Sequence, residues 1–126
     1  MAENTATLSA TGGQPEVELI IGQLQLGDHM IILFDKNGKN GVVVGKNPNG
    51  TPVAVRYEIP RPLAELDGNI LRWNCIIGTT SLGTQNASVT LRVIQDGQVV
   101  PGGEIVTRKK IQELDIIKDR ARLIVK

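Results

Sequence analysis

Short segments of alternating apolar and polar residues recur along this chain, and such alternation is typical of half-buried β-strands. Glu16–Ile21, Pro52–Ile59 and Ala87–Ile94 show it most clearly. Met30–Phe34 is a continuous apolar run, and Ile70–Ile77 is typical of a central strand. We therefore expect a protein built mainly of β-strands.

Residues that favour turns separate these segments. The turn-rich stretches are Asp35–Gly41, Lys46–Gly50, Pro60–Gly68, Gly78–Asn86 and the hairpin signal Asp96-Gly97. Short strands spaced by such turns predict an all-β fold, and we expect an antiparallel β-sandwich of about seven to eight short strands. Prolines interrupt the strand pattern in Pro60–Gly68, where a short helical turn fits around Leu63–Leu66.

The C-terminal segment has two interpretations. Apolar residues recur there at spacings of three and four, which is typical of one face of an amphipathic helix. These residues are Ile111, Leu114, Ile117, Ala121 and Ile124. The final segment Arg122–Lys126 alternates instead like an edge strand. The sequence therefore leaves a C-terminal amphipathic helix and a last strand as open alternatives.

Residues 1–14 are small and polar, so we expect them to form a flexible N-terminal arm or one weak edge strand. The chain has 126 residues, which suits one domain and is too short for two ordinary ones. The predicted organisation is therefore an arm over residues 1–14, followed by a single β-sandwich domain over residues 15–126.

Composition narrows the classes of partner. Phe34, Tyr57 and Trp73 are the only aromatic residues, so we expect an aliphatic core that includes Trp73. A net charge of +1 provides no field that attracts nucleic acid or an anionic membrane. Half of the 14 Lys and Arg residues lie in the last 23 residues, and we interpret this excess as a solvated face. Without a signal-peptide pattern or a long apolar run, we expect a cytoplasmic protein or one exported without a signal peptide.

Few residues in this sequence can support catalysis or bind a metal. His29 is the single histidine, and Cys75 is the single cysteine, which we interpret as a buried thiol. Asp35–Asn40 has the start of a calcium-loop pattern, but the glycine is fourth rather than sixth, and Lys46 stands at the twelfth position where the pattern requires a glutamate. We interpret this segment as a turn stabilised by its aspartate. We expect neither an enzyme nor a cofactor or metal site.

One polar loop offers hydrogen-bonding groups to a small ligand. It spans Gly78–Asn86, and its candidate ligand-binding residues are Thr79, Thr80, Gln85 and Asn86. Their hydroxyl and amide groups can bind a carbohydrate, although sugar sites usually add an aromatic platform. Trp73 is the only strong candidate for such a platform, and we expect it in the core.

Three hypotheses for function follow from these observations. The leading one is a non-catalytic protein-interaction or self-assembly module, whose partner is a second copy of the chain or another protein. The arm supports it, because an extended segment can add to the edge of a neighbouring sheet. The alternative is a lectin-like carbohydrate-binding protein that uses loops at one end of the sandwich. The third hypothesis is a hydrolase or transferase built around His29.

Overall fold

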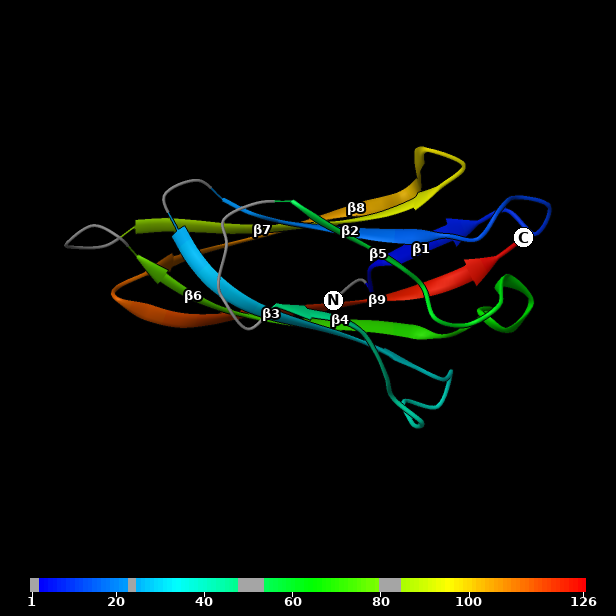
Figure 1. Ribbon diagram of the computed structural model, residues 1–126, viewed down its shortest axis with the longest axis horizontal. Coiled ribbons are helices and arrows are strands. Elements are labelled where there is room, and N and C mark those ends of the chain that lie inside the picture. The colour runs from blue at the N-terminus through cyan, green and yellow to red at the C-terminus, as the bar shows by residue number, and fades with distance from the viewer. Residues whose placement is uncertain (1–2, 23–24, 48–53, 80–84) are drawn as a thin grey trace.

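The structure of the protein, a computed structural model, describes residues 3–22, 25–47, 54–79 and 85–126. This part of the chain contains nine β-strands and one turn of 3₁₀-helix (Figure 1). They are β1 (Thr5–Leu8), β2 (Glu16–Ile21), β3 (Gln25–Phe34), β4 (Val42–Asn47), β5 (Val55–Glu58), η1 (Leu63–Glu65), β6 (Ile70–Thr79), β7 (Gln85–Gln95), β8 (Gln98–Ile111) and β9 (Leu114–Val125). The predicted all-β class and the helical turn are confirmed. The strand number exceeds the prediction because β1 and a full-length β9 both form. No helix in the described ranges is long and apolar enough to cross a membrane.

Two β-sheets make up the fold. Sheet A has the strand order β1-β9-β6-β3-β4, and sheet B has the order β5-β2-β7-β8. Figure 1 shows the sheets as two layers that lie face to face. Neighbouring strands are antiparallel except for β1 and β9, so the prediction of purely antiparallel pairing is wrong at this edge. These two strands come from opposite ends of the chain, so no tight hairpin forces them to run in opposite directions.

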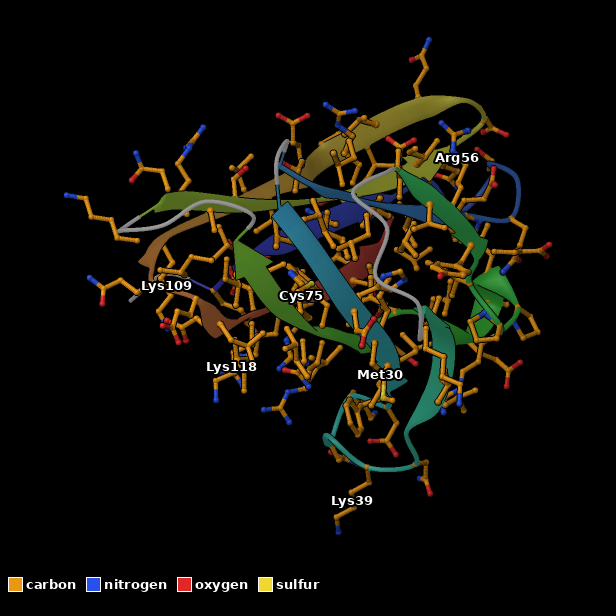
Figure 2. The ribbon with its side chains drawn as sticks, turned by 60° about the vertical axis from the view of Figure 1, so that its left-hand side comes forward. Met30, Lys39, Arg56, Cys75, Lys109 and Lys118 are labelled. Carbon is orange, nitrogen blue, oxygen red and sulfur yellow. The ribbon has the colours of Figure 1, made fainter. Side chains whose placement is uncertain are left out.

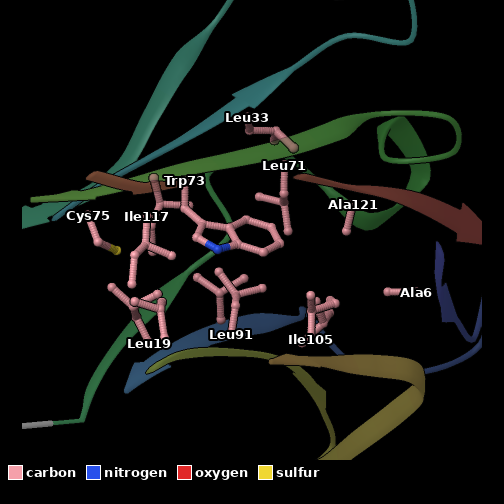
Figure 3. Packing of buried hydrophobic residues seen from close by; sticks show 14 of the residues in the cluster. Ala6, Leu19, Leu33, Leu71, Trp73, Cys75, Leu91, Ile105, Ile117 and Ala121 are labelled. Atoms are coloured by element: carbon pink, nitrogen blue, oxygen red, sulfur yellow. The ribbon is translucent and has the colours of Figure 1, made fainter. Parts of the chain in front are cut away.

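The core lies between the sheets and consists of alternating strand residues. In β6, Leu71, Trp73 and Ile77 point inward and are fully buried. Leu19 of β2 and Leu91 of β7 approach them from sheet B (Figure 3). Trp73 is the one fully buried aromatic residue, so the core is aliphatic around it, as the composition predicts. Burial of each large apolar side chain contributes roughly 1.5–3 kcal/mol.

The C-terminal segment is a strand, and the alternative of an amphipathic helix is wrong. β9 pairs with β6 along nine consecutive residue pairs. Ile117, Ala121 and Leu123 are buried, whereas Leu114 is 68% exposed although the helical pattern places it on the buried face. The two patterns overlap because a spacing of four is an even number, so Ile117 and Ala121 share one face in a strand as well as in a helix.

The N-terminal strand β1 is an edge strand of sheet A. Its residues Ala6 and Leu8 are fully buried, and the N–H of Lys126 donates a hydrogen bond to the carbonyl oxygen of Leu8 (3.0 Å). Gly102 of β8 has a φ of +70°, and a Cβ there would collide with the carbonyl oxygen of Thr5. A glycine therefore lets β8 lie against β1. The domain boundary after residue 14 stays a prediction.

Candidate functional site

The outer face of sheet A places apolar side chains beside cations. The strand register arranges them in rows that run from β4 to β9. One row contains Val43, Ile32, Arg72 and Arg120, the next contains Lys46, Met30, Asn74 and Lys118, and the adjoining rows add Phe34, Asp28, Ile76 and Ile116. We call these twelve residues the sheet A face. Figure 2 shows that Met30 and Lys118 project from it on the side away from Arg56 of sheet B.

Part of the sheet A face is apolar and uncovered. Met30 of β3 is 38% exposed and Val43 of β4 is 50% exposed. Ile76 and Ile116 lie directly opposite each other on β6 and β9 and are 45% and 52% exposed. Single exposed apolar residues are ordinary on protein surfaces, but adjoining ones form a patch of the kind that marks interaction sites.

Arg72, Lys118 and Arg120 form a cationic cluster on β6 and β9. Arg72 lies directly opposite Arg120 in the register, and Lys118 is two residues before Arg120 on the same face. Opposed residues have Cβ atoms about 4.5–5.5 Å apart, a spacing at which like charges destabilise a sheet. Within the described residues, none of the three cations forms an ion pair. The sheet therefore holds these positive charges together without neutralising them.

On the outer face of sheet B, one row of charged residues is compensated by ion pairs. This row contains Arg56, Glu18, Arg92 and Glu104, so the charges alternate in sign from β5 to β8. Three ion pairs of 3.3, 3.3 and 2.8 Å join these neighbours. The hydrogen bond to Glu104 raises the pKa of Arg92. This row of sheet B is therefore compensated, whereas Arg72, Lys118 and Arg120 on sheet A form no ion pair among the described residues.

Two open pockets adjoin on the sheet A face. The first has a volume of about 230 Å³ and is lined by Arg72, Asn74, Lys118, Asp119 and Arg120. The second has a volume of about 250 Å³ and is lined by Ile32, Phe34, Arg72, Asn74 and Lys118. They lie side by side because they share three lining residues. Pockets for whole small molecules span roughly 300–1,000 Å³, so each of these suits a single chemical group.

Arg72 and Asp119 are both held in place around the first pocket. The guanidinium carbon of Arg72 lies 5.7 Å from the centre of the Phe34 ring, within the range of a cation–π interaction. The carboxylate of Asp119 accepts hydrogen bonds from Asn4 Nδ2 (3.2 Å) and Thr107 Oγ1 (2.9 Å). The lining residues thus carry three positive charges and one negative charge, and the difference is two positive charges.

A larger open pocket, of about 530 Å³, lies at the β5 edge of sheet B. Gln14 and Arg61 supply much of its polar lining. Gln14 Nε2 donates to the carbonyl oxygens of Ile59 (2.9 Å) and Arg61 (2.7 Å). Arg61 Nη1 donates to Asn69 Oδ1 (2.8 Å). These donors hold the loop after β5, so we do not assign them a ligand.

The predicted ligand-binding loop lies largely outside the described residues. Thr80 is outside them, and Thr79 and Gln85 are described only as the last residue of β6 and the first residue of β7. Asn86 is exposed. β6 belongs to sheet A and β7 to sheet B, and a carbohydrate site in the segment between them stays a prediction. The predicted core position of Trp73 is confirmed, so this ring is not available as a sugar-stacking platform.

His29 and Cys75 are opposite each other on β3 and β6, and both are buried. Burial raises the pKa of the Cys75 thiol to about 12, so the thiol is protonated at neutral pH and is a poor nucleophile. His29 Nε2 lies 2.7 Å from the hydroxyl of Tyr57, and the two groups share a hydrogen bond. The pair contains no activated nucleophile. The expectation that the chain is not an enzyme stays a prediction.

The turn after β3 has the structure that we predicted for it. Asp35 Oδ1 accepts hydrogen bonds from the backbone N–H groups of Asn37 and Lys39 (both 2.9 Å), and Oδ2 accepts one from Asn40 Nδ2 (2.7 Å). These bonds, led by that from Lys39, lower the pKa of Asp35. Its carboxylate therefore stabilises the turn. The described residues hold no group of three His, Cys, Asp or Glu side chains that suits a metal.

Sequence reasoning missed the cationic cluster, because its members come from two segments far apart in the chain. Lys118 and Arg120 belong to the cation-rich C-terminus, which we interpreted as a solvated face. Arg72 stands alone among apolar residues. One signal in the sequence could have indicated the cluster. Residues two apart in a strand lie on the same face, so Lys118 and Arg120 share one face of their strand, and Arg72 and Asn74 share one face of theirs. Only the register shows that these faces coincide.

Comparisons with known proteins do not assign this site. No family model, no curated protein and no solved structure matches the chain.

Proposed function

We propose that this protein is a non-catalytic interaction module that binds an acidic segment of another protein on the sheet A face. The observation that carries the proposal is the uncompensated cationic cluster beside exposed apolar side chains. Charge complementarity selects an acidic partner, because positive patches at interfaces meet negative ones. The apolar side chains bury surface when the partner docks, which supplies the non-directional part of the affinity.

The residue types of the sheet A face support a protein partner. Arg, Met and Phe are enriched at protein interfaces relative to the rest of the surface. Arg72, Met30 and Phe34 lie in adjoining rows of this face. The continuous apolar run Met30–Phe34 leads to the same conclusion. Continuous runs are typical of strands covered on both faces, yet within this chain Met30 is uncovered.

The test is binding to a soluble peptide of alternating glutamate and leucine, which presents carboxylates on one side and apolar groups on the other. Isothermal titration calorimetry at low ionic strength is expected to give saturable binding. Lys118→Glu and Arg120→Glu are expected to weaken it by at least about tenfold, because each reverses a charge at the contact. The matched control Arg108→Glu, which reverses an exposed cation on β8, is expected to leave the affinity unchanged.

Two results would contradict the proposal. One is equal loss of affinity in the sheet A variants and in Arg108→Glu, which indicates a net-charge effect without a site. The other is self-association seen by light scattering and abolished by Lys118→Glu. A second copy offers Glu16 and Glu58, which lie directly opposite each other on sheet B. Self-association would therefore identify the chain itself as the occupant of the sheet A face.

A further inference from the structure

We propose that the two adjoining pockets of the sheet A face together bind a phosphorylated aromatic side chain of the protein partner. This inference rests on the proposed function and names the group that the module recognises. The phosphoryl group occupies the pocket between Arg72, Lys118 and Arg120. The aromatic ring occupies the neighbouring pocket beside Ile32 and Phe34.

The first pocket matches the charge and the size of a phosphoryl group. Its lining carries two net positive charges, and a phosphate monoester carries about −1.5 to −2 at pH 7. A carboxylate supplies one negative charge and leaves the other uncompensated. The planar guanidinium groups of Arg72 and Arg120 can each donate two parallel hydrogen bonds to phosphoryl oxygens. Both arginines are exposed, as is Asn74, which lines both pockets.

The second pocket suits an aromatic ring. Ile32 and Phe34 of β3 form its apolar side, and Phe34 provides a ring for offset or edge-to-face contact with a second ring. The cation–π contact of 5.7 Å with Phe34 holds Arg72 at the boundary of the two pockets. Because both pockets share Arg72, Asn74 and Lys118, a ligand must join its charged and apolar parts directly. A phosphorylated phenol has this structure.

The compact arrangement of the cationic cluster also favours a single phosphoryl group over a nucleic-acid backbone. A nucleic-acid backbone repeats its phosphates along a line, and proteins that bind it place cations along a groove. On the sheet A face Arg72, Lys118 and Arg120 surround one pocket, and Ile32 and Val43 continue the row of Arg72 and Arg120 across β3 and β4, whereas the next row ends in Lys46. A row that passes from cations to apolar residues fits one phosphoryl group on an apolar carrier.

The probe for this proposal is phenyl phosphate, titrated into the full chain and followed by ¹H–¹⁵N NMR. Saturable shifts centred on Arg72, Asn74 and Arg120 are expected. Arg72→Gln and Arg120→Gln are expected to raise the dissociation constant about tenfold or more, because each removes charge-assisted hydrogen bonds. Arg120→Lys keeps the positive charge but loses the planar guanidinium that donates two parallel hydrogen bonds, and an intermediate loss of affinity is expected. Arg108→Gln is the matched control and is expected to stay within about twofold of the unmodified protein.

Three ligands of related chemistry decide the assignment. Inorganic phosphate is expected to bind more weakly than phenyl phosphate, and Phe34→Ala is expected to remove that difference. Benzoate, with one negative charge, is expected to bind more weakly than phenyl phosphate. Benzoate binding as tightly as phenyl phosphate would overturn the phosphoryl assignment. Inorganic phosphate binding as tightly as phenyl phosphate would overturn the assignment of the second pocket to an aromatic ring. The NMR spectrum of each variant without ligand shows that it is folded.

This inference and the proposed function can fail separately. Binding of the glutamate–leucine peptide without binding of phenyl phosphate would refute the phosphoryl pocket and leave the interaction module standing. Binding of phenyl phosphate without binding of the peptide would support the pocket and refute docking of a broader acidic segment. Binding of neither probe would refute both.

Discussion

His29 and Tyr57 connect the two sheets through their side chains. His29 belongs to β3 of sheet A, and Tyr57 belongs to β5, an edge strand of sheet B. Their polar atoms lie 2.7 Å apart, and their ring centres lie 5.7 Å apart. Gly45 on β4 leaves room for the Tyr57 ring, since a Cβ there would collide with it. This contact gives the only histidine of the chain a structural role.

The pH dependence of stability tests that role. The pKa of His29 lies below 6.5 because burial disfavours the charged imidazolium form, and this effect outweighs the stabilisation of that charge by the nearby carboxylate of Asp28. Above pH 6.5 both the folded and the unfolded chain are largely neutral at this residue. As the pH falls through about 6.5, the unfolded chain takes up a proton that the folded chain does not, so the free energy of unfolding is expected to fall.

Urea denaturation between about pH 7.5 and about pH 5 measures this loss. In His29→Gln, which keeps a polar partner for Tyr57 but does not titrate, the stability is expected to vary much less with pH over the same interval. The pKa values of Asp35 and Asp115 lie below 3.8, so the loss of their interactions occurs at lower pH. An equal slope in both proteins would assign the pH dependence to another group.

At the scale of elements, alternation predicted where strands occur but not how they pair. Val17, Leu19 and Ile21 are buried on one face of β2, as their spacing predicts. The sequence does not decide between an arm and an edge strand for β1, because Thr5–Leu8 is short and half of it is polar. Its burial depends on β9 and on Gly102 of β8, and contacts between the two ends of a chain leave no local signal.

Truncation of Leu8 tests whether β1 is part of the folded structure. Leu8 is fully buried, so Leu8→Ala is expected to lower the free energy of unfolding by about 2–5 kcal/mol. Thr5→Ala is the matched control at the exposed first position of the same strand, and a change within about 0.5 kcal/mol is expected. Chemical denaturation of both variants gives the values. Equal small changes would mean that residues 1–14 behave as a flexible arm in solution.

At the scale of the whole molecule, one row of charges on each sheet shows a different arrangement. On sheet B the row from Arg56 to Glu104 pairs each cation with a carboxylate, and such pairs contribute little individually but avoid repulsion. On sheet A, Arg72 opposes Arg120 without a carboxylate between them. The free protein therefore retains a repulsion that a bound anion removes. This difference identifies the candidate site, and it lies beyond sequence analysis because the net charge of +1 averages over both sheets.

The repulsion predicts a variant that is more stable but binds less well. Arg120→Gln removes the charge opposite Arg72, so its melting temperature without ligand is expected to rise by a few degrees over the unmodified protein. Arg108→Gln is the control, because Arg108 lies opposite the uncharged Ser88, and no rise is expected. High salt is expected to reduce the difference by screening. Added phenyl phosphate is expected to stabilise the unmodified protein more than Arg120→Gln, because a ligand stabilises the state it binds. A lower melting temperature for Arg120→Gln would show that Arg120 stabilises the free fold, and that no repulsion on the sheet A face is left for a bound anion to remove.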